Sequence, residues 1–483
     1  MNFRLILKTL GNLLRVCGLF TVLPFIVSLI HGGEDAAVFA VTTVIMEVIG
    51  TLLTLTKPED KHLRVRDAFF VAGISWVLLS VFGALPLYFS GYFNGFVDCF
   101  FESVSGFTTT GSTILTNIEV LPRGIVFWRS LTHWIGGMGV LSFMMAVMPS
   151  INASSVNLLK AESTGPAPDK IVPKIQETAR IIYLIYIVMT VLLILLLKIA
   201  GYPLFDAVIN AFSTAGTGGF SSMNSSIAAY GNPVSEVIIT VFLFLFGINF
   251  SLYFVLIGRN FKKFFFDEEL RTYFGVVIVA ILIITVNISG LYGSFEEALR
   301  YSSFQVTSVI STAGFMTADY NLWPTLSKVI LMFITVTGCC AGSTGGGMKL
   351  VRFIILFKAA KLEIHKILHP ASVKPVSING KKISEEMISK TALFFFVYFM
   401  LFTAAVLIIS IEGKDIVSSA TAVITSLSNV GPGLNIVGPA GNYSSFSAVS
   451  KIVLSVCMIA GRLEFFPVLI LFTPSIWKKG AVT

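Results

Sequence analysis

Residues 101–113 read FESVSGFTTTGST, a short apolar segment that runs directly into threonine, serine and glycine. Three later stretches have the same character: residues 205–221 read FDAVINAFSTAGTGGFS, residues 304–317 read FQVTSVISTAGFMT, and residues 423–434 read VITSLSNVGPGL. Each apolar segment has about 10–14 residues, too few to cross a bilayer, which is typical of a re-entrant segment. The alternative, ordinary extracellular turns, explains the polar residues but not the apolar segment before each of them.

The four stretches align on one glycine each, here named the anchor glycines: Gly111, Gly219, Gly314 and Gly431. Six residues before each anchor lies a residue with a hydroxyl group: Ser105, Ser213, Ser308 and Thr425. Thirteen residues before the anchor, the first two stretches both carry an aspartate, Asp98 and Asp206. Gly216 is a rival anchor in the second stretch, but it breaks both matches. Internal repetition of this kind indicates one structural unit used four times.

The segments around the loops indicate a membrane protein. The chain is 55% hydrophobic and 12% charged, and a soluble domain has about twice that charged fraction. Apolar runs such as 181–200, 274–291 and 393–411 reach or approach the ~20 residues that span a bilayer. All four copies have the same orientation, unlike the inverted repeats of many transporters. We therefore expect an all-α integral membrane protein with four parallel helix–pore-loop–helix repeats in a pseudo-fourfold arrangement around a central pore.

The predicted units are an N-terminal two-helix extension at 1–66, repeat 1 at 67–150, repeat 2 at 180–260, repeat 3 at 272–360 and repeat 4 at 390–475. The first apolar run follows Arg4, Lys8 and Arg15, as the apolar region of a cleaved signal peptide would. No A-x-A-like cleavage site follows that run, and a second apolar run begins at once. We therefore expect the first run to be a retained helix.

Lysine and arginine are concentrated in every second connection. The basic clusters lie at 57–66, 160–180, 259–271, 349–390 and 478–479, and the connections between them hold almost no basic residues. The positive-inside rule then predicts that the basic connections and both termini lie on the cytoplasmic side of the inner membrane. Because this topology accounts for the net charge of +8, we expect no nucleic-acid partner.

The four loops have the chemistry to pass an alkali cation. Converging backbone carbonyl oxygens can replace the hydration shell of the ion, and glycine adopts the positive φ that lets a loop turn its carbonyls inward. The loops contain no acidic ring, which argues against a divalent-cation filter. We expect the cation to be the substrate, with no cofactor bound by the chain. The predicted filter residues are Thr109, Thr110, Gly111, Thr217, Gly218, Gly219, Thr312, Ala313, Gly314, Asn429, Val430 and Gly431.

Together with the stretches GCCAGSTGGGMK at 338–349 and GRLEFF at 461–466, these loops resemble the Trk/Ktr/HKT superfamily. The resemblance covers essentially the whole chain and is strongest to the TrkH/TrkG group, the transmembrane subunits of bacterial Trk potassium-uptake systems. It implies potassium uptake, a homodimer and a cytosolic TrkA-like nucleotide-binding regulatory subunit. Glycine at all four anchor positions matches the potassium-selective members. The alternative is a sodium-permeable transporter or cation-coupled symporter of the same superfamily.

The run from about 326 to 356 is too long for one crossing, and a glycine-rich segment interrupts it. Because each glycine costs ~1 kcal/mol inside a helix, this segment predicts a break. A Walker A loop is excluded by spacing, since no G-x-x-x-x-G-K-[ST] motif is present. The resemblance implies an intramembrane gate at 338–349, and a helix kink for packing is the alternative. The predicted gate residues are Gly342, Ser343, Thr344, Gly345, Gly346, Gly347 and Lys349.

Arg462 lies within the apolar stretch 452–471, where a charge normally faces a partner or a water-filled cavity. A contact with Glu464 is the alternative, but residues two apart do not face each other on a helix. We therefore expect Arg462 to point into the pore, where the resembling family also has an arginine. Glu47 is expected to be a packing or polar-contact residue within the N-terminal helix pair, and His133 is expected to be a helix residue at the membrane interface rather than a ligand.

Two other function classes fit the sequence poorly. A carrier for another solute predicts broken inverted repeats, and a membrane enzyme predicts histidine and acidic residues clustered at one face, whereas the five histidines are scattered. We therefore expect no catalytic residues.

The basic loop at 349–390 directly follows the predicted gate. Its Lys358, Lys361 and Lys366 are the predicted contacts of the regulatory subunit, with membrane lipid headgroups as the alternative partner.

Overall fold

The computed structural model describes residues 1–56, 58, 64–139, 175–370, 374–471 and 473. In this part of the chain the regular secondary structure is helical, apart from one hairpin of two short strands, β1 (Ser377–Ile378) and β2 (Lys381–Lys382). Six helical segments there are long and apolar enough to cross a membrane, or seven if a bent pair counts as one. The prediction of an all-α, multi-pass membrane protein is confirmed. The predicted features that lie outside the described residues are 140–150, 472, 474–475, Lys57, Lys61, Lys160, Lys170, Lys174, Lys478 and Lys479.

The N-terminal extension is a helical hairpin made of α1 (Phe3–Phe20), α2 (Val22–Ile30) and α3 (Ala36–Thr54). Its two arms approach closely at a pair of glycines, since a Cβ on Gly11 would lie 2.6 Å from the carbonyl oxygen of Gly50. Small residues favour helix association in membranes because they let the backbones come close. Of the two roles expected for Glu47, the structure shows the polar contact, an ion pair with Arg15 at 3.3 Å.

Each repeat contains an outer helix, a pore helix and an inner helix. The outer helices are α4 (Val65–Gly83), α10 (Ile175–Ile199), α15 (Glu268–Ile288) and α19 (Glu385–Ser410). The pore helices are α6 (Phe96–Phe107), α11 (Leu204–Ala215), α16 (Phe295–Ile310) and α20 (Ile416–Ser428). The inner helices are α7 (Arg123–Gly137), α12 (Pro233–Phe246), α17 (Thr325–Thr337) and α21 (Ala448–Arg462). Shorter helices and helices beyond the inner ones are α5 (Leu85–Phe89), α13 (Phe250–Ile257), α14 (Phe261–Phe265), α18 (Leu350–Leu368) and α22 (Phe466–Leu471).

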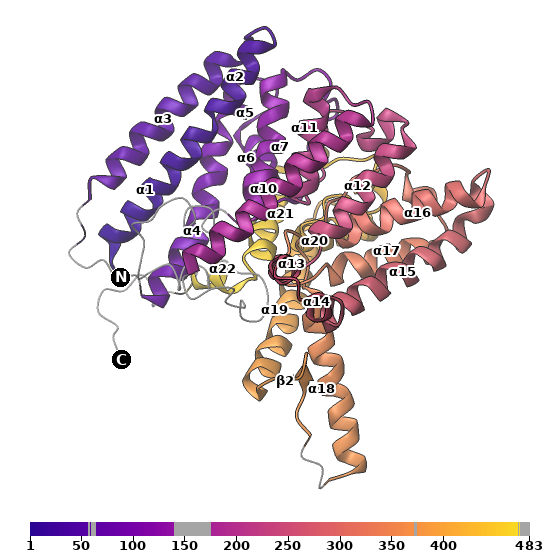
Figure 1. The fold of residues 1–483 in the computed structure, drawn as a ribbon. Coiled ribbons are helices and arrows are strands. Elements are labelled where there is room, and N and C mark those ends of the chain that lie inside the picture. Colours follow the sequence, from indigo (N-terminus) through magenta and orange to yellow (C-terminus); the bar gives the residue numbers. More distant parts are fainter. Residues whose placement is uncertain (57, 59–63, 140–174, 371–373, 472, 474–483) are drawn as a thin grey trace.

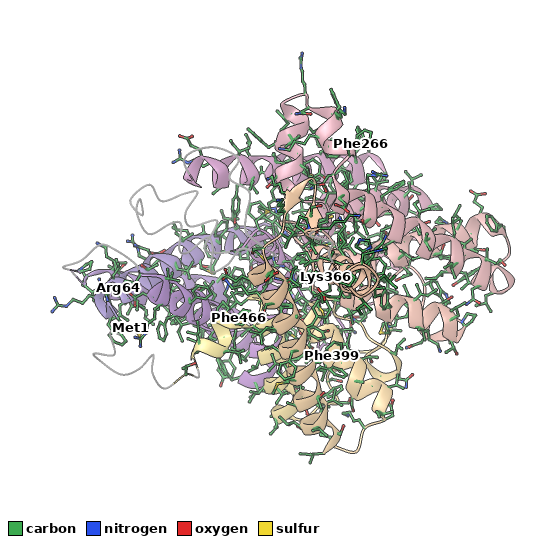
Figure 2. All side chains as sticks on the ribbon, turned by 90° about the horizontal axis from the view of Figure 1, so that it is seen from below. Met1, Arg64, Phe266, Lys366, Phe399 and Phe466 are labelled. Atoms are coloured by element: carbon green, nitrogen blue, oxygen red, sulfur yellow. The ribbon has the colours of Figure 1, made fainter. Side chains whose placement is uncertain are left out.

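The four repeats form a closed ring. Each inner helix packs against the pore helix of the following repeat: α7 on α11, α12 on α16, α17 on α20, and α21 back on α6. The last of these contacts joins repeat 4 to repeat 1. Seen from below, Arg64, Phe266 and Phe399 lie on three different sides of the molecule, and Lys366 lies close to its centre (Figure 2). Figure 1 shows the same helices from the side, with α18 projecting beyond the helical bundle.

The pore helices end inside the protein because they are short. α6 and α11 have 12 residues, α20 has 13 and α16 has 16. At 1.5 Å per residue they are roughly 18–24 Å long, less than the ~30 Å hydrocarbon thickness of a bilayer. Asp415 caps the start of α20 by accepting the backbone N–H of Ser418 at 2.9 Å, which stabilises the positive end of the helix dipole. The opposite, partly negative end of each pore helix therefore leads into its loop.

The inner helices stop at similar points in the repeats. α12 and α13 meet at an angle of 92°, α17 ends before the loop 338–349, and α21 ends at Arg462 before α22. The sequence predicted only the break in repeat 3, where four glycines stand together. In repeats 2 and 4 a single glycine, Gly247 or Gly461, stands at the break, which is too weak a local signal to predict one.

Candidate functional site

The four loops after the pore helices have the same unusual backbone. Every anchor glycine has a positive φ: 79° at Gly111, 82° at Gly219, 72° at Gly314 and 92° at Gly431. Two residues earlier the φ angle is also positive: 56° at Thr109, 53° at Thr217, 65° at Thr312 and 53° at Asn429. A positive φ is rare for threonine and costs roughly 1–3 kcal/mol per residue. Its repetition in all four loops indicates a conformation that the surrounding structure imposes.

Hydrogen bonds from the ends of the pore helices hold this conformation. In each loop the N–H of the residue before the anchor donates to the carbonyl of the hydroxyl residue found by alignment. These bonds are Thr110 to Ser105 at 2.9 Å, Gly218 to Ser213 at 2.8 Å, Ala313 to Ser308 at 2.8 Å, and Val430 to Thr425 at 2.9 Å. The second loop therefore keeps this register at Gly219, and Gly216 is instead the residue that directly follows the end of α11.

The loops contact one another in a ring. A Cβ placed on an anchor glycine would collide with the carbonyl oxygen of the residue before the anchor in the next loop. The distances would be 1.9 Å from Gly111 to Gly218, 2.0 Å from Gly219 to Ala313, 2.1 Å from Gly314 to Val430, and 2.6 Å from Gly431 to Thr110. The structure thus brings all the predicted filter residues together, in the cyclic order of the repeats. No residue other than glycine fits the anchor positions without displacing backbone.

Polar side chains behind the loops accept the N–H of the third residue after the anchor. Glu102 accepts the N–H of Ile114 at 3.1 Å. With its amide oxygen turned toward the loop, Gln305 accepts that of Thr317 at 2.8 Å. The hydroxyl of Thr421 accepts the N–H of Leu434 at 3.1 Å. Sequence reasoning missed these residues, although alignment on the anchor glycines puts Glu102 and Gln305 at the same position, nine residues before the anchor.

The first loop is supported by a buried ion pair. Arg129 on α7 contacts Glu102 at 2.7 Å, and both side chains are at most 1% exposed. Arg129 also lies over the ring of Phe220, 4.1 Å from its centroid, directly after the second anchor glycine. Breaking a buried pair by removing one partner costs about 3–5 kcal/mol. The pair therefore fixes the first and second loops relative to each other.

The prediction that His133 lies at the membrane interface is wrong. Its side chain is fully buried, stacks on Phe220 with ring centroids 4.1 Å apart, and has its Nδ1 atom 2.8 Å from the carbonyl oxygen of Gly106. The reason is the ring closure between repeats, because α7 packs against α11 and so carries His133 behind the second loop. The local sequence does not contain that contact.

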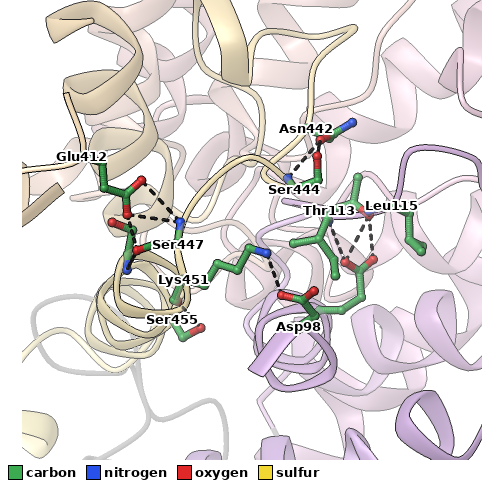
Figure 3. A network of polar contacts seen from close by, with 12 residues as sticks. Asp98, Thr113, Leu115, Glu412, Asn442, Ser444, Ser447, Lys451 and Ser455 are labelled. Atoms are coloured by element: carbon green, nitrogen blue, oxygen red, sulfur yellow. Dashed lines mark hydrogen bonds and ion pairs between the residues drawn. The ribbon is translucent and has the colours of Figure 1, made fainter. Parts of the chain in front are cut away.

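The aspartates found by alignment lie beside the outer ends of the pore helices. Asp98 on α6 accepts a hydrogen bond from Lys451 on α21 at 2.7 Å, a contact between repeats 1 and 4 that Figure 3 shows. Asp206 accepts from the hydroxyl of Ser222 at 2.5 Å within repeat 2. On the same side of the ring, Glu236 and Arg300 join repeats 2 and 3. These charges are thus used to hold neighbouring elements together.

The predicted gate loop at 338–349 lies directly below the four loops. The N–H of Gly346 donates to the Thr312 hydroxyl at 2.7 Å. A Cβ on Gly346 would lie 2.5 Å from the carbonyl oxygen of Ser428. On the side of repeat 2, the N–H of Cys340 donates to the carbonyl of Gly247 at 3.1 Å. The loop therefore contacts repeats 2 and 4 as well as the loop of its own repeat.

Two buried cations hold the predicted gate loop. Lys349 is 1% exposed, and its ammonium donates to the carbonyl of Gly345 and to the hydroxyl of Ser343. The guanidinium of Arg462 donates to the carbonyl of Thr344 at 2.8 Å and to two carbonyls at the end of α7, those of Gly136 at 2.6 Å and Gly137 at 2.7 Å. Arg462 therefore joins the loop to repeat 1, while Glu464 pairs with Arg352.

Comparison with known proteins gives concordant matches along the chain. A family model described as a cation transport protein, TrkH, matches residues 36–479. The Trk system potassium uptake protein TrkH of Salmonella typhimurium is 36% identical over 485 residues, which is 99% of this chain and 100% of that protein. TrkG of Escherichia coli K12 is 33% identical over 488 residues, 99% of both chains. The crystal structure of the potassium transporter TrkH from Vibrio parahaemolyticus has a TM-score of 0.90 and 30% identity, covering 99% of this chain and 100% of that one.

Proposed function

The chain belongs to the TrkH family of cation transport proteins, and on this premise we propose that it takes up potassium ions through the ring of four loops. The observation that carries the proposal is the ring, in which each anchor glycine lies against a carbonyl of the next loop. Carbonyl oxygens in such a ring can replace water around an alkali ion. The relatives are potassium uptake proteins, which supports potassium as the ion. The family consists of transporters, so the chain is not an enzyme.

We assign the potassium site to the backbone of the predicted filter residues. In an extended strand, successive carbonyls point to opposite sides. The filter residues are not such a strand, because positive and negative φ angles alternate along each loop. The carboxyl ends of the four pore helices add partial negative charge at the same place. Such a filter needs no acidic ligands, and within the described part of the chain no three His, Cys, Asp or Glu side chains are grouped as a metal site.

Potassium uptake is expected to be restored when the chain is expressed in a cell that lacks its own potassium uptake and grows at low external potassium. Rubidium tracer uptake measured in the same cells should saturate, and unlabelled potassium should compete much more strongly than sodium. If sodium competes as strongly as potassium at equal concentration, the sodium-permeable alternative is favoured. No tracer uptake by a protein that is present in the membrane would contradict the proposal.

We propose that the loop at 338–349 closes the path below the filter. Its contacts with repeats 2 and 4 and with the loop of its own repeat, the burial of Lys349, and the three carbonyls bound by Arg462 support a closed arrangement in the structure. Opening requires those contacts to break. The functional units proposed are 1–66, 67–150, 180–260, 272–360 and 390–475, as the sequence predicted.

The basic connections support a cytoplasmic location for both termini in an inner membrane. The relatives are named as parts of a Trk system, and the family works together with other subunits. We propose a homodimer and a cytosolic TrkA-like nucleotide-binding subunit that contacts α18, the helix directly after the gate loop. α18 supports this because it projects from the bundle (Figure 1) and exposes Phe357, Ile364 and Ile367 by 74%, 61% and 78%.

The structure changes which lysines best test this contact. Lys358 pairs with Glu268 and donates to the carbonyl of Ser377 at 2.8 Å, so its reversal would also disturb the fold. We expect Lys361→Glu with Lys366→Glu to weaken binding of a TrkA-like ring and to remove nucleotide-dependent flux, with basal selectivity unchanged. The measurements are co-purification and flux in liposomes without anionic lipid.

The matched control is the same double charge reversal at Lys262 and Lys263 on α14. It should leave binding of the regulator intact. Equal losses in both double variants would indicate a general effect of cytoplasmic charge, and full regulator binding by the α18 variant would contradict the proposed contact. A defect that appears only in liposomes with anionic lipid would indicate a lipid contact instead.

A further inference from the structure

The fourth loop differs from the other three at its anchor glycine. The carbonyl oxygen of Gly431 accepts a hydrogen bond from the hydroxyl of Tyr443 at 2.7 Å and a longer one from the hydroxyl of Ser112 at 3.4 Å. Among the hydrogen bonds of the described residues, the carbonyls of the other anchors, Gly111, Gly219 and Gly314, accept none. One carbonyl of this layer is thus already bound by protein.

The backbone at Gly431 also departs from the fourfold symmetry of the ring. Its φ is 92°, whereas the other anchors lie between 72° and 82°. A Cβ on Gly431 would lie 2.6 Å from the next loop's carbonyl, while the other three distances are 1.9 to 2.1 Å. By both values the fourth anchor differs from the other three.

Tyr443 is held firmly between repeats 4 and 1. Its side chain is 2% exposed, its backbone N–H donates to the carbonyl of Thr113 at 2.8 Å, and its ring packs against Phe101 with centroids 5.5 Å apart. Figure 3 shows its neighbours Asn442 and Ser444 beside Thr113. These contacts hold the tyrosine hydroxyl against the Gly431 carbonyl.

We propose that Tyr443 sets the potassium affinity and selectivity of the filter by binding the Gly431 carbonyl, so that the layer of anchor carbonyls offers three free oxygens to the ion. The proposal rests on the proposed function and names a residue that tunes it. Selectivity among alkali cations depends on the number and field strength of the coordinating carbonyls. A carbonyl engaged by a hydroxyl contributes less to both.

The chain provides a matched control for this test. Tyr320 is also buried, at 1% exposure, and its hydroxyl donates at 3.1 Å to the carbonyl of Pro432, the residue after the anchor. Each of the variants Tyr443→Phe and Tyr320→Phe therefore removes one buried hydroxyl. The two hydroxyls bind consecutive carbonyls of the same loop, those of Gly431 and Pro432. The first acts on the anchor layer, and the second acts just outside it.

Tyr443→Phe is expected to lower the half-saturation constant for potassium uptake by about twofold to tenfold, the range to which the net strength of one hydrogen bond corresponds. Competition by sodium should weaken by a similar factor. Tyr320→Phe should leave both values unchanged. The measurements are rubidium uptake with potassium and sodium competition, and the potassium-dependent rise in melting temperature of the purified proteins, which is independent of the gate.

The inference would be overturned if a folded Tyr443→Phe protein had the half-saturation constant and sodium competition of wild type. A loss of selectivity would also overturn it, because it would mean that the bond holds the loop in place. If Tyr443→Phe does not fold, Ser112→Ala can be used instead, because it removes the longer contact to the same oxygen. A half-saturation constant for potassium that rises or stays the same in Ser112→Ala would then overturn the inference. Absence of potassium uptake by the wild-type protein would instead remove the proposed function, and this inference with it.

Discussion

Replacing Gly111 with serine should lower the ratio of potassium to sodium uptake by at least about tenfold, a change of ~1.4 kcal/mol in relative ion binding. The new Cβ would lie 1.9 Å from the carbonyl oxygen of Gly218, a distance that no real contact reaches. The carbonyl of Gly218 must therefore move, and the ring around the ion widens on that side. The residue would also keep a φ of 79°, which disfavours any side chain.

The measurement is rubidium uptake with sodium competition in cells that make equal amounts of each protein. Gly91→Ser is the matched control, because Gly91 has a similar φ of 74° but nothing within 4 Å of the added Cβ. It isolates the cost of the backbone angle from the collision in the ring. A selectivity ratio unchanged in a folded Gly111→Ser protein would contradict the assignment of Gly111 to the filter.

The register of the loops was accessible from the sequence because it depends on contacts within one repeat. A hydroxyl residue six positions before the anchor distinguished Gly219 from Gly216, and in the structure that residue's carbonyl, Ser213 in the second loop, holds the turn. The positive φ of Thr109, Thr217 and Thr312 was not predictable, because local rules reject this angle for a β-branched residue. The geometry of the ring overrides those rules.

What the sequence could not predict are contacts between repeats. The partners of Arg462 at the end of α7 lie 325 and 326 positions away along the chain, and Tyr443 reaches the first loop across the junction of repeats 4 and 1. Such pairs come together only when the ring closes, so no periodicity or motif records them. For the same reason the sequence could predict that an intramembrane arginine faces a partner or a cavity, whereas it could not predict the carbonyls that the arginine binds.

Replacing Arg462 with glutamine should raise the basal flux through the purified protein, without any regulatory subunit, by at least about tenfold. The guanidinium binds the carbonyls of Thr344, Gly136 and Gly137, and hydrogen bonds to a charged group contribute about 1.5–3 kcal/mol each. These bonds connect the predicted gate loop to repeat 1. Their loss shifts the equilibrium toward the open state by the amount by which they stabilise the closed state over the open one. Rubidium efflux from liposomes is the measurement.

Arg462→Lys separates the two ways in which the arginine can restrict flux. Lysine keeps the positive charge but lacks the planar fork that reaches carbonyls on two separate segments. If the bonds hold the loop closed, the lysine variant should leak more than wild type, whereas a purely electrostatic barrier should persist in it. Lys451→Gln, which removes another buried cation from the same helix but leaves the gate contacts intact, should keep the basal flux low. Basal flux equal to wild type in a folded Arg462→Gln protein would mean that the loop stays closed without its connection to repeat 1.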